Sequence, residues 1–320
     1  MHSRNFCSSY RCSFILFYSQ SILLWVSVAV SITGCSPDKK DWYKSFNSDR
    51  AFAHVQKQVV LGERPSGSVE LAKAADQIEA ELKGCGLKVH CSEFEVSGTV
   101  RGAVRFRNVI ATTASWPPRE GAVLLASHYD TKWLPGERFV GANDAGSSTG
   151  CLLEIARVLS TVRSSHRDFV FVFFDGEEAF GEYTEKDGLY GSRRLASEMK
   201  VNGSLRRLRA MILLDMIGDE DLKVTIPTGN PALVKAVFDA SEALGWRDHF
   251  SLGDVPMLDD HHPFEAEGVP CADLIDFNYG PQNSYWHTRQ DTLDKISPQS
   301  LEIVGKTVLK MLEDMSSEAR

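Results

Sequence analysis

One run of the sequence, Asp168-Phe-Val-Phe-Val-Phe-Phe-Asp175, constrains the fold more than any other segment. Its β-branched and aromatic residues favour a β-strand and argue against a surface helix. Two more short apolar runs, Ala122–Tyr129 and Ala210–Ile217, also read as strands. The run 122–129 has no polar face, which is typical of a strand buried on both sides. We therefore expect helices to cover both faces of the sheet that contains such strands.

Strand-like and helix-like segments alternate along the chain, and this pattern favours a three-layer α/β domain. The helices should carry an apolar stripe with helical spacing, as in 69–84, where the apolar residues recur every three or four positions. We expect an α/β/α sandwich with a central mixed, mostly parallel sheet, in one domain over residues 46–320. The expected helices are 69–84, 147–161, 188–200, 231–244 and 298–315, and the expected strands are 87–95, 104–113, 122–129, 168–175, 210–217 and 272–277.

The first residues resemble an export signal and not a part of the fold. Arg4 and Arg11 precede an apolar run over 21–30, and small residues follow directly before Cys35. This order is similar to the bacterial lipoprotein signal. It implies a signal peptide over 1–34, lipidation of Cys35, a tether over 35–45, and a protein exported to the periplasm or cell envelope with only a lipid in the membrane. An ordinary secretory signal or an uncleaved anchor remains an alternative.

Charge and cysteine content exclude some classes of function. The formal net charge is −8 and no Lys/Arg cluster stands out after residue 40, which argues against nucleic acid as a partner. Four cysteines remain after Cys35, namely Cys85, Cys91, Cys151 and Cys271, and none has a catalytic context. Cys85 and Cys91 could pair in an exported protein, but their spacing does not decide it. We expect a monomer.

Carboxylates and histidines follow the expected strands, at the point where each strand ends. In an open α/β sheet, sites form in the crevice beyond the carboxyl ends of the strands. Histidine and carboxylate ligands suit zinc. Adjacent carboxylates such as Glu177-Glu178 repel one another unless a cation or a proton compensates them, so one can bind a metal while the other acts as a base. The residues at strand ends are His128, Asp130, Asp144, Asp175, Glu177, Glu178, Asp215 and His287.

Without Asp175, this set resembles the M28 zinc peptidase family in order and spacing over roughly residues 50–315. The resemblance implies the zinc aminopeptidase fold, also called phosphorylase/hydrolase-like. It also implies that Glu177 is the general base and that Asp130 orients His128. The implied metal ligands are His128, Asp144, Glu178, Asp215 and His287.

Several stretches are similar to the glutaminyl cyclases within that family, which convert N-terminal Gln of peptides or proteins to pyroglutamate with release of ammonia. In that branch a single zinc is held by the positions of Asp144, Glu178 and His287. Asp215 and Asp259 would then act on the substrate amine, while Trp286, Tyr183 and Asp273 would belong to the substrate pocket. The stretches are Gly62–Ser68, His128–Lys132, Phe139–Ala142, Phe173–Phe180, Asp187–Arg193, Asp259–Phe264 and Trp286–Thr288.

Other features differ from the cyclases and keep a second function open. The loop Asn143–Gly150 is closer to the corresponding loop of the aminopeptidases, and Tyr183 and Asp273 replace a Trp and a His of the animal cyclases. The alternative is a peptidase with two zinc ions bridged by Asp144, in which Glu177 activates a metal-bound water. Both enzymes would act on peptide N-termini. A non-catalytic binding protein on the same fold is the third hypothesis.

Overall fold

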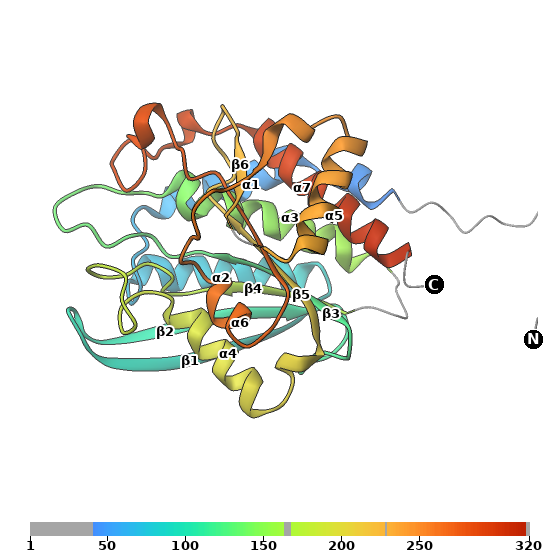
Figure 1. Cartoon of the computed structure of the whole chain (residues 1–320). Coiled ribbons are helices and arrows are strands. Elements are labelled where there is room, and N and C mark those ends of the chain that lie inside the picture. Colours follow the sequence, from blue (N-terminus) through green and yellow to red (C-terminus); the bar gives the residue numbers. More distant parts are fainter. Residues whose placement is uncertain (1–40, 163–167, 228, 318–320) are drawn as a thin grey trace, which may run out of the picture. The chain divides into compact units, whose positions relative to one another are not determined.

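One mixed sheet forms the middle layer of the structure (Figure 1). The computed structural model describes residues 41–162, 168–227 and 229–317. Within these residues the sheet has eight strands in the order β1-β2-β4-β3-β5-β8-β6-β7. The strands are β1 (Lys88–Thr99), β2 (Gly102–Thr112), β3 (Ala122–His128), β4 (Phe169–Phe174), β5 (Leu208–Asp215), β6 (Val224–Ile226), β7 (Phe250–Leu252) and β8 (Cys271–Ile275).

The four central strands β4, β3, β5 and β8 run parallel to one another. On one side β2 is antiparallel to β4 and forms a hairpin with β1. On the other side β6 is antiparallel to β8 and parallel to β7. The carboxyl ends of the central strands therefore meet at one edge of the sheet, where a site is expected.

Strand β4 explains why the sheet is covered on both faces. Phe169, Phe171 and Phe173 pack into the core on the face covered by α1, α2, α3, α5 and α7. Val170, Val172 and Phe174 alternate with them and pack on the other face, against α4 and α6. The expected three-layer sandwich is therefore confirmed. The helices are α1 (Ser48–Leu61), α2 (Val69–Gly84), α3 (Ser148–Ser160), α4 (Tyr190–Val201), α5 (Pro231–Ala243), α6 (His262–Glu265) and α7 (Pro298–Ser317).

The structure corrects the expected start of the domain. Residues Trp42–Ser45, predicted as part of a tether over 35–45, form a 3-10 helix. Trp42 is buried and its ring meets Phe169 edge-on at 6.1 Å between centroids. A large aromatic side chain gains more from this burial than from exposure on a tether, so the core begins before residue 46.

Other predictions about the chain have different outcomes. The signal peptide over 1–34 and the lipidated Cys35 lie outside the described residues. Cys85 and Cys91 are both free thiols, and Cys91 instead donates to Glu79. Among the helices described, none is long and apolar enough to cross a membrane.

Candidate metal centre

Asp144 lies at the centre of the predicted site and faces a histidine with each of its oxygens. Its Oδ1 is 3.3 Å from His128 Nε2, and its Oδ2 is 3.2 Å from His287 Nε2. His128 Nε2 is also 3.2 Å from Asp215 Oδ1, and His287 Nε2 is 2.9 Å from Glu178 Oε1. The five predicted metal ligands thus form two donor groups that share Asp144.

The local structure of the chain brings these five residues to one place. His128 ends β3 and Asp215 ends β5, which are parallel neighbours in the sheet. Asp144 lies in the irregular helical turn Ala142–Ser147 that leads into α3. Glu178 follows β4, and His287 lies in the loop after β8 with a left-handed φ of 54°. Each predicted ligand therefore comes from the end of a strand or from a loop beyond the carboxyl ends of the strands.

The spacing of the donor atoms fits an ion of the size of zinc. Zinc bonds of about 2.0–2.1 Å in tetrahedral geometry place neighbouring ligand atoms about 3.3 Å apart. The four contacts made by the Nε2 atoms of the two histidines measure 2.9–3.3 Å. Imidazole and carboxylate are also the donor types that zinc accepts. Both donor groups therefore fit a zinc-type metal.

The charges of the site depend strongly on one another because water is largely excluded. Burial by itself lowers the pKa of His128, but its three neighbouring carboxylates raise it well above its ordinary value. Burial raises the pKa of Asp144, but hydrogen bonds with His128 and His287 outweigh it and leave the pKa below its ordinary value. Burial also opposes the charge of His287, whereas Glu178 and Asp144 raise its pKa to about 10. Positive charge between these carboxylates stabilises them, and a divalent cation supplies it when the imidazoles are neutral.

Glu177, the predicted base, is held beside this centre by its own backbone. Gly176 has a φ of 80°, and a Cβ there would lie 2.5 Å from the Phe106 ring, so only glycine fits this turn. The backbone N–H groups of Glu177 and Glu178 donate to the two oxygens of Asp130, at 3.2 and 3.3 Å. Burial raises the pKa of Glu177 well above its ordinary value, although His128 lowers it. The turn thus holds a proton-accepting group directly before Glu178, one of the predicted ligands.

Asp130 does more than the sequence indicated. It was predicted to orient His128, and its Oδ1 lies 3.5 Å from His128 Nδ1. The same carboxylate also holds the backbone of both glutamates. Ser66 supports the arrangement, since its hydroxyl lies 2.6 Å from Asp175 and 3.4 Å from Asp130. One buried carboxylate therefore holds the backbone of the predicted base and lies close to the ring of His128, whose Nδ1 has no hydrogen-bond partner among the described residues.

Tyr183, predicted as a residue of the substrate pocket, contacts the predicted base with its hydroxyl group. Its hydroxyl lies 2.8 and 3.0 Å from the two oxygens of Glu177 and 3.1 Å from Glu178 Oε2. Its single proton can therefore be donated to either glutamate. Lys132, which was not singled out, adds a positive charge 3.6 Å from Glu178 Oε2 and 5.0 Å from the centre of the Tyr183 ring. Lys132 belongs to the stretch His128–Lys132, which is similar to the cyclases. Its closeness in sequence to the predicted ligand His128 was the signal that could have identified it.

Asp291 supports the metal centre and was missed by the sequence analysis. Its Oδ1 accepts from the backbone N–H of Asn143 at 2.7 Å, and its Oδ2 accepts from that of Asp144 at 3.1 Å. The hydroxyl of Tyr279 donates to Oδ1 at 2.9 Å. Burial raises the pKa of Asp291 to about 7, although the bond from Asn143 lowers it. Asp291 thereby fixes the loop that carries the shared ligand.

The remaining predicted residues divide into one that borders the centre and two that are buried. Trp286 is partly exposed and stacks on the ring of His287, with centroids 4.0 Å apart and planes 22° apart. Asp273 is fully buried on β8, and its predicted place in the substrate pocket stays a prediction. It pairs with Leu213 of β5 and so lies on the same face of the sheet as Asp215. Asp259 is also buried, and its predicted role on the substrate amine stays a prediction.

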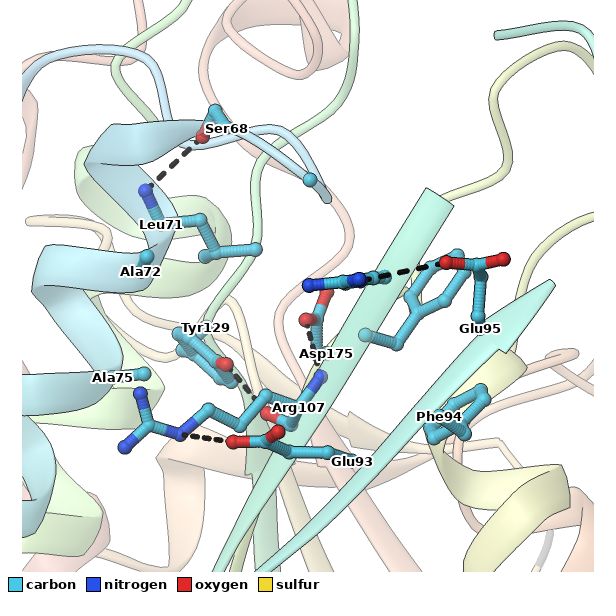
Figure 2. A pocket seen from close by; sticks show the side chains of 13 residues that line it. Ser68, Leu71, Ala72, Ala75, Glu93, Phe94, Glu95, Arg107, Tyr129 and Asp175 are labelled. Atoms are coloured by element: carbon cyan, nitrogen blue, oxygen red, sulfur yellow. Dashed lines mark hydrogen bonds and ion pairs between the residues drawn. The ribbon is translucent and has the colours of Figure 1, made fainter. Parts of the chain in front are cut away.

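A separate pocket of about 430 Å³ lies between α2 and the β1–β2 hairpin (Figure 2). Its apolar side includes Leu71 and Phe94, and Glu93 and Arg107 lie at its charged side. It reaches Asp175, which follows β4 directly, but none of the predicted ligands lines it. The pocket is therefore a neighbour of the metal centre and not part of it.

The parallel strands of the mixed sheet end at two donor groups that share one carboxylate. This arrangement defines the protein as a metal-dependent α/β enzyme. A family model described as "Peptidase family M28" matches residues 108–312. The chain belongs to peptidase family M28.

Comparisons with single proteins give the branch of that family. The chain is 30% identical to the glutaminyl-peptide cyclotransferase of Drosophila melanogaster, over 78% of this chain and 76% of that relative. It is 35% identical to the solved glutaminyl cyclase of an Acidobacteriales bacterium, with a TM-score of 0.78 over 83% of this chain and 94% of that one. A Zn-dependent exopeptidase from Parabacteroides distasonis is 28% identical, with a TM-score of 0.73 over 83% and 97% of the two chains. The predicted resemblance to the glutaminyl-cyclase branch of the family is confirmed.

Proposed function

We propose that this protein is a zinc-dependent glutaminyl cyclase that converts the N-terminal Gln of peptides or proteins to pyroglutamate and releases ammonia. The observation that carries the proposal is the position of Glu177, buried beside the donor group Asp144–Glu178–His287 and fixed by Asp130 and Tyr183. Similarity to proteins named glutaminyl-peptide cyclotransferase over most of the chain supports the same activity.

The group that would hold the catalytic zinc is Asp144, Glu178 and His287. This group supplies two carboxylates and one imidazole, the donor types that zinc accepts. Bound there, zinc supplies a Lewis acid for the side-chain amide carbonyl of the substrate Gln. Trp286, stacked on His287 and partly exposed, would form an apolar wall beside that carbonyl.

Glu177 carries the proton in this reaction. The α-amine nitrogen of the substrate forms a bond to the side-chain amide carbon, and the bond from that carbon to the amide nitrogen breaks. Glu177 accepts a proton from the attacking amine and gives it to the departing nitrogen, which leaves as ammonia. Asp215, at the end of β5, would hold the amine by a hydrogen bond. Because both reacting groups belong to one residue, their orientation supplies much of the acceleration.

A two-zinc aminopeptidase is the second candidate, and one observation favours it. The two oxygens of Asp144 face different donor groups, as the carboxylate that bridges two metals must do. In that enzyme His128 and Asp215 would hold the second zinc, and Glu177 would activate a water for attack on the peptide bond. The two functions thus differ in whether His128 and Asp215 bind a metal or the substrate amine.

An assay with two substrates separates these functions. The purified protein with zinc is incubated with a peptide that starts Gln-Phe and, separately, with leucine p-nitroanilide. We expect the peptide to lose ammonia while the leucine substrate remains intact. Release of a free amino acid from either substrate would instead identify an aminopeptidase.

We further propose that the protein is exported and acts as a monomer on peptide N-termini, with Cys35 lipidated. The support is the order of basic, apolar and small residues before Cys35. Metabolic labelling with a radioactive fatty acid tests the anchor. The wild-type chain should be labelled and a Cys35→Ser chain should not, and equal labelling of the two would refute the proposal.

A further inference from the structure

Arg64 carries a charged side chain that is completely buried, with 0% of its surface exposed. It follows helix α1 closely and belongs to the stretch Gly62–Ser68. Burying a charge is costly unless partners compensate it. Among the residues that the structure describes, Arg64 forms no ion pair with a carboxylate. Its contacts with other groups must therefore explain why an arginine is kept at this position.

One side of the guanidinium group is anchored at the end of helix α1. Its Nη1 lies 3.2 Å from the carbonyl oxygen of Gln58 and 3.0 Å from that of Gly62. Gln58 is in the last turn of α1, and Gly62 is its C-cap. Carbonyl groups at the end of a helix lack helical partners and carry partial negative charge, so they stabilise a cation. This helix end therefore supplies a fixed seat for Arg64.

The other side of the guanidinium group holds the segment that leads to Asp144. Nη1 lies 2.8 Å from the carbonyl oxygen of Val140, and Nη2 lies 3.2 Å from that of Gly141. The Gly141 carbonyl also accepts from the backbone N–H of Gly146 at 3.1 Å, which closes the turn around Asp144. A Cβ at Gly141 would lie 2.0 Å from the Asp144 carbonyl oxygen, so the two backbones are in close contact. A shift of the Gly141 carbonyl would therefore move the shared metal ligand.

The same segment reaches a second ligand, and the backbone of Arg64 reaches a second loop. Phe139, which precedes Val140, is buried, and its ring meets that of His287 edge-on with 5.7 Å between centroids. The backbone N–H of Arg64 donates to the Thr131 hydroxyl at 2.9 Å, and its carbonyl accepts from Thr131 N at 3.1 Å. Thr131 directly follows Asp130, which holds the two glutamates. Arg64 thus lies where three parts of the metal centre are joined.

The charge of Arg64 and its hydrogen bonds have opposite effects on a metal ion nearby. Burial lowers the pKa of Arg64 to about 10, although Asp291, Asp130 and Asp144 raise it, so the side chain is a cation at neutral pH. A fixed cation repels a metal ion, whereas a fixed loop keeps Asp144 in place for it. Because four directed contacts hold the guanidinium group, we expect the effect of position to be the larger of the two.

We propose that Arg64 is a positioning residue of the metal centre: its guanidinium group holds the carbonyl groups of Val140 and Gly141 and thereby the turn that presents Asp144 to both donor groups. This role rests on the metal centre of the proposed function and not on the reaction. Zinc affinity tests it without turnover, so a protein that binds zinc but does not cyclise Gln would leave this proposal standing.

Competition with a chromophoric zinc chelator tests the role in an Arg64→Met variant, which keeps an unbranched side chain and loses both the charge and the donors. We expect zinc to bind about 10-fold or more weakly, in the range usual for a lost partner of a metal ligand. Ile78→Ala is the matched control, because it creates a cavity at a buried position of α2 and leaves the segment 139–141 intact. This control should lower the melting temperature and keep the zinc affinity of the wild type.

A second variant, Arg64→Lys, carries the test if Arg64→Met does not fold. Lysine keeps the charge, but its single amino group cannot replace a fork that reaches carbonyl groups on two sides. We expect zinc affinity between those of the wild type and Arg64→Met. The visible absorption spectrum of the cobalt(II)-loaded protein, which reports the geometry of the ligands, should change in both variants and not in Ile78→Ala.

Three results would overturn the proposal. The first is wild-type zinc affinity in a folded Arg64→Met protein, or in a folded Arg64→Lys protein where the methionine variant does not fold. The second is tighter zinc binding in Arg64→Met, which would show that repulsion between two cations outweighs the positioning of Asp144. The third is an equal loss of zinc affinity in Ile78→Ala, which would assign the effect to general destabilisation.

Discussion

The support that Asp291 gives to the metal centre can be tested by a nearly isosteric substitution, Asp291→Asn. The carboxylate accepts from Asn143 N and Asp144 N with different oxygens. An amide keeps only one acceptor oxygen, so at least one of these buried N–H groups loses its partner. An unpaired buried donor costs about 1–3 kcal/mol.

This cost should appear as weaker metal binding, because the substitution disturbs the loop that carries Asp144. Asp144 is the ligand common to both donor groups. Each factor of ten in affinity corresponds to about 1.4 kcal/mol. We therefore expect zinc to bind about 10- to 100-fold more weakly to Asp291→Asn, in the range usual for a lost partner of a metal ligand.

Competition with a chromophoric zinc chelator measures this affinity. The titration belongs at a pH of about 8, because the pKa of Asp291 is about 7 and its carboxylate is then ionised. Tyr279→Phe is the matched control, since it removes the third donor to Asp291 and keeps both backbone bonds, so its loss should be smaller than that of Asp291→Asn. Wild-type zinc affinity in a folded Asp291→Asn protein would refute the reasoning.

Three further predictions concern catalysis, core packing and pH. Tyr183→Phe removes a hydroxyl that contacts both oxygens of Glu177, so kcat should fall about 10-fold or more with little change in KM; an unchanged kcat in steady-state assays would contradict this role. Phe171→Ala, at a fully buried position of β4, should lower the free energy of unfolding by about 3–5 kcal/mol in urea titrations, and a loss under about 1 kcal/mol would be inconsistent with this core. Burial raises the pKa of Asp276 to about 6, above an unfolded value of about 3.9, so the folded state binds the proton more tightly and loses stability as pH rises through about 6. Asp276→Asn should therefore stabilise the protein by about 1–3 kcal/mol near pH 8 and by less near pH 4, and the opposite order would disprove the assignment.

The strands and the ligands could be predicted because their signals are local. The apolar run that forms β4 has one interpretation, and the residue at the end of such a run lies at a known edge of the sheet. The pair Glu177-Glu178 was informative for the same reason, since its position after a buried strand places it in the crevice. The order of these residues along the chain then matched the family to which the chain belongs.

Other elements were missed because their signals are weak or distant in the sequence. Helix α1 buries His54 and Gln58 beside Ala51 and Val55, and polar residues on the buried face conceal its periodicity. Strands β6 and β7 have three residues each, too few for an alternation to be recognised. Asp291 acts on a loop 147 residues earlier in the chain, and no local pattern records such a contact.

The positions of Tyr183 and Asp273 show a second limit of prediction from the sequence. Alignment to a family position predicted both as pocket residues, but it does not fix the direction of a side chain. The hydroxyl of Tyr183 turns to Glu177, because a buried carboxylate needs a donor. Asp273 lies on the face of the sheet that Leu213 and Asp215 share, because position on a strand decides which face a side chain occupies.

The central claim is that Glu177 moves the proton in cyclisation of N-terminal Gln, next to a zinc that it does not hold. The most direct measurement is mass spectrometry of a Gln-Phe peptide incubated with the zinc-loaded wild type and with a zinc-loaded Glu177→Gln variant, whose zinc content is measured in parallel. We predict that the wild type releases one ammonia per peptide, and that the variant keeps its zinc at the Asp144 site but leaves the peptide unchanged. A variant that retains most of the cyclase activity would contradict the account, and so would a wild-type protein that does not convert the peptide.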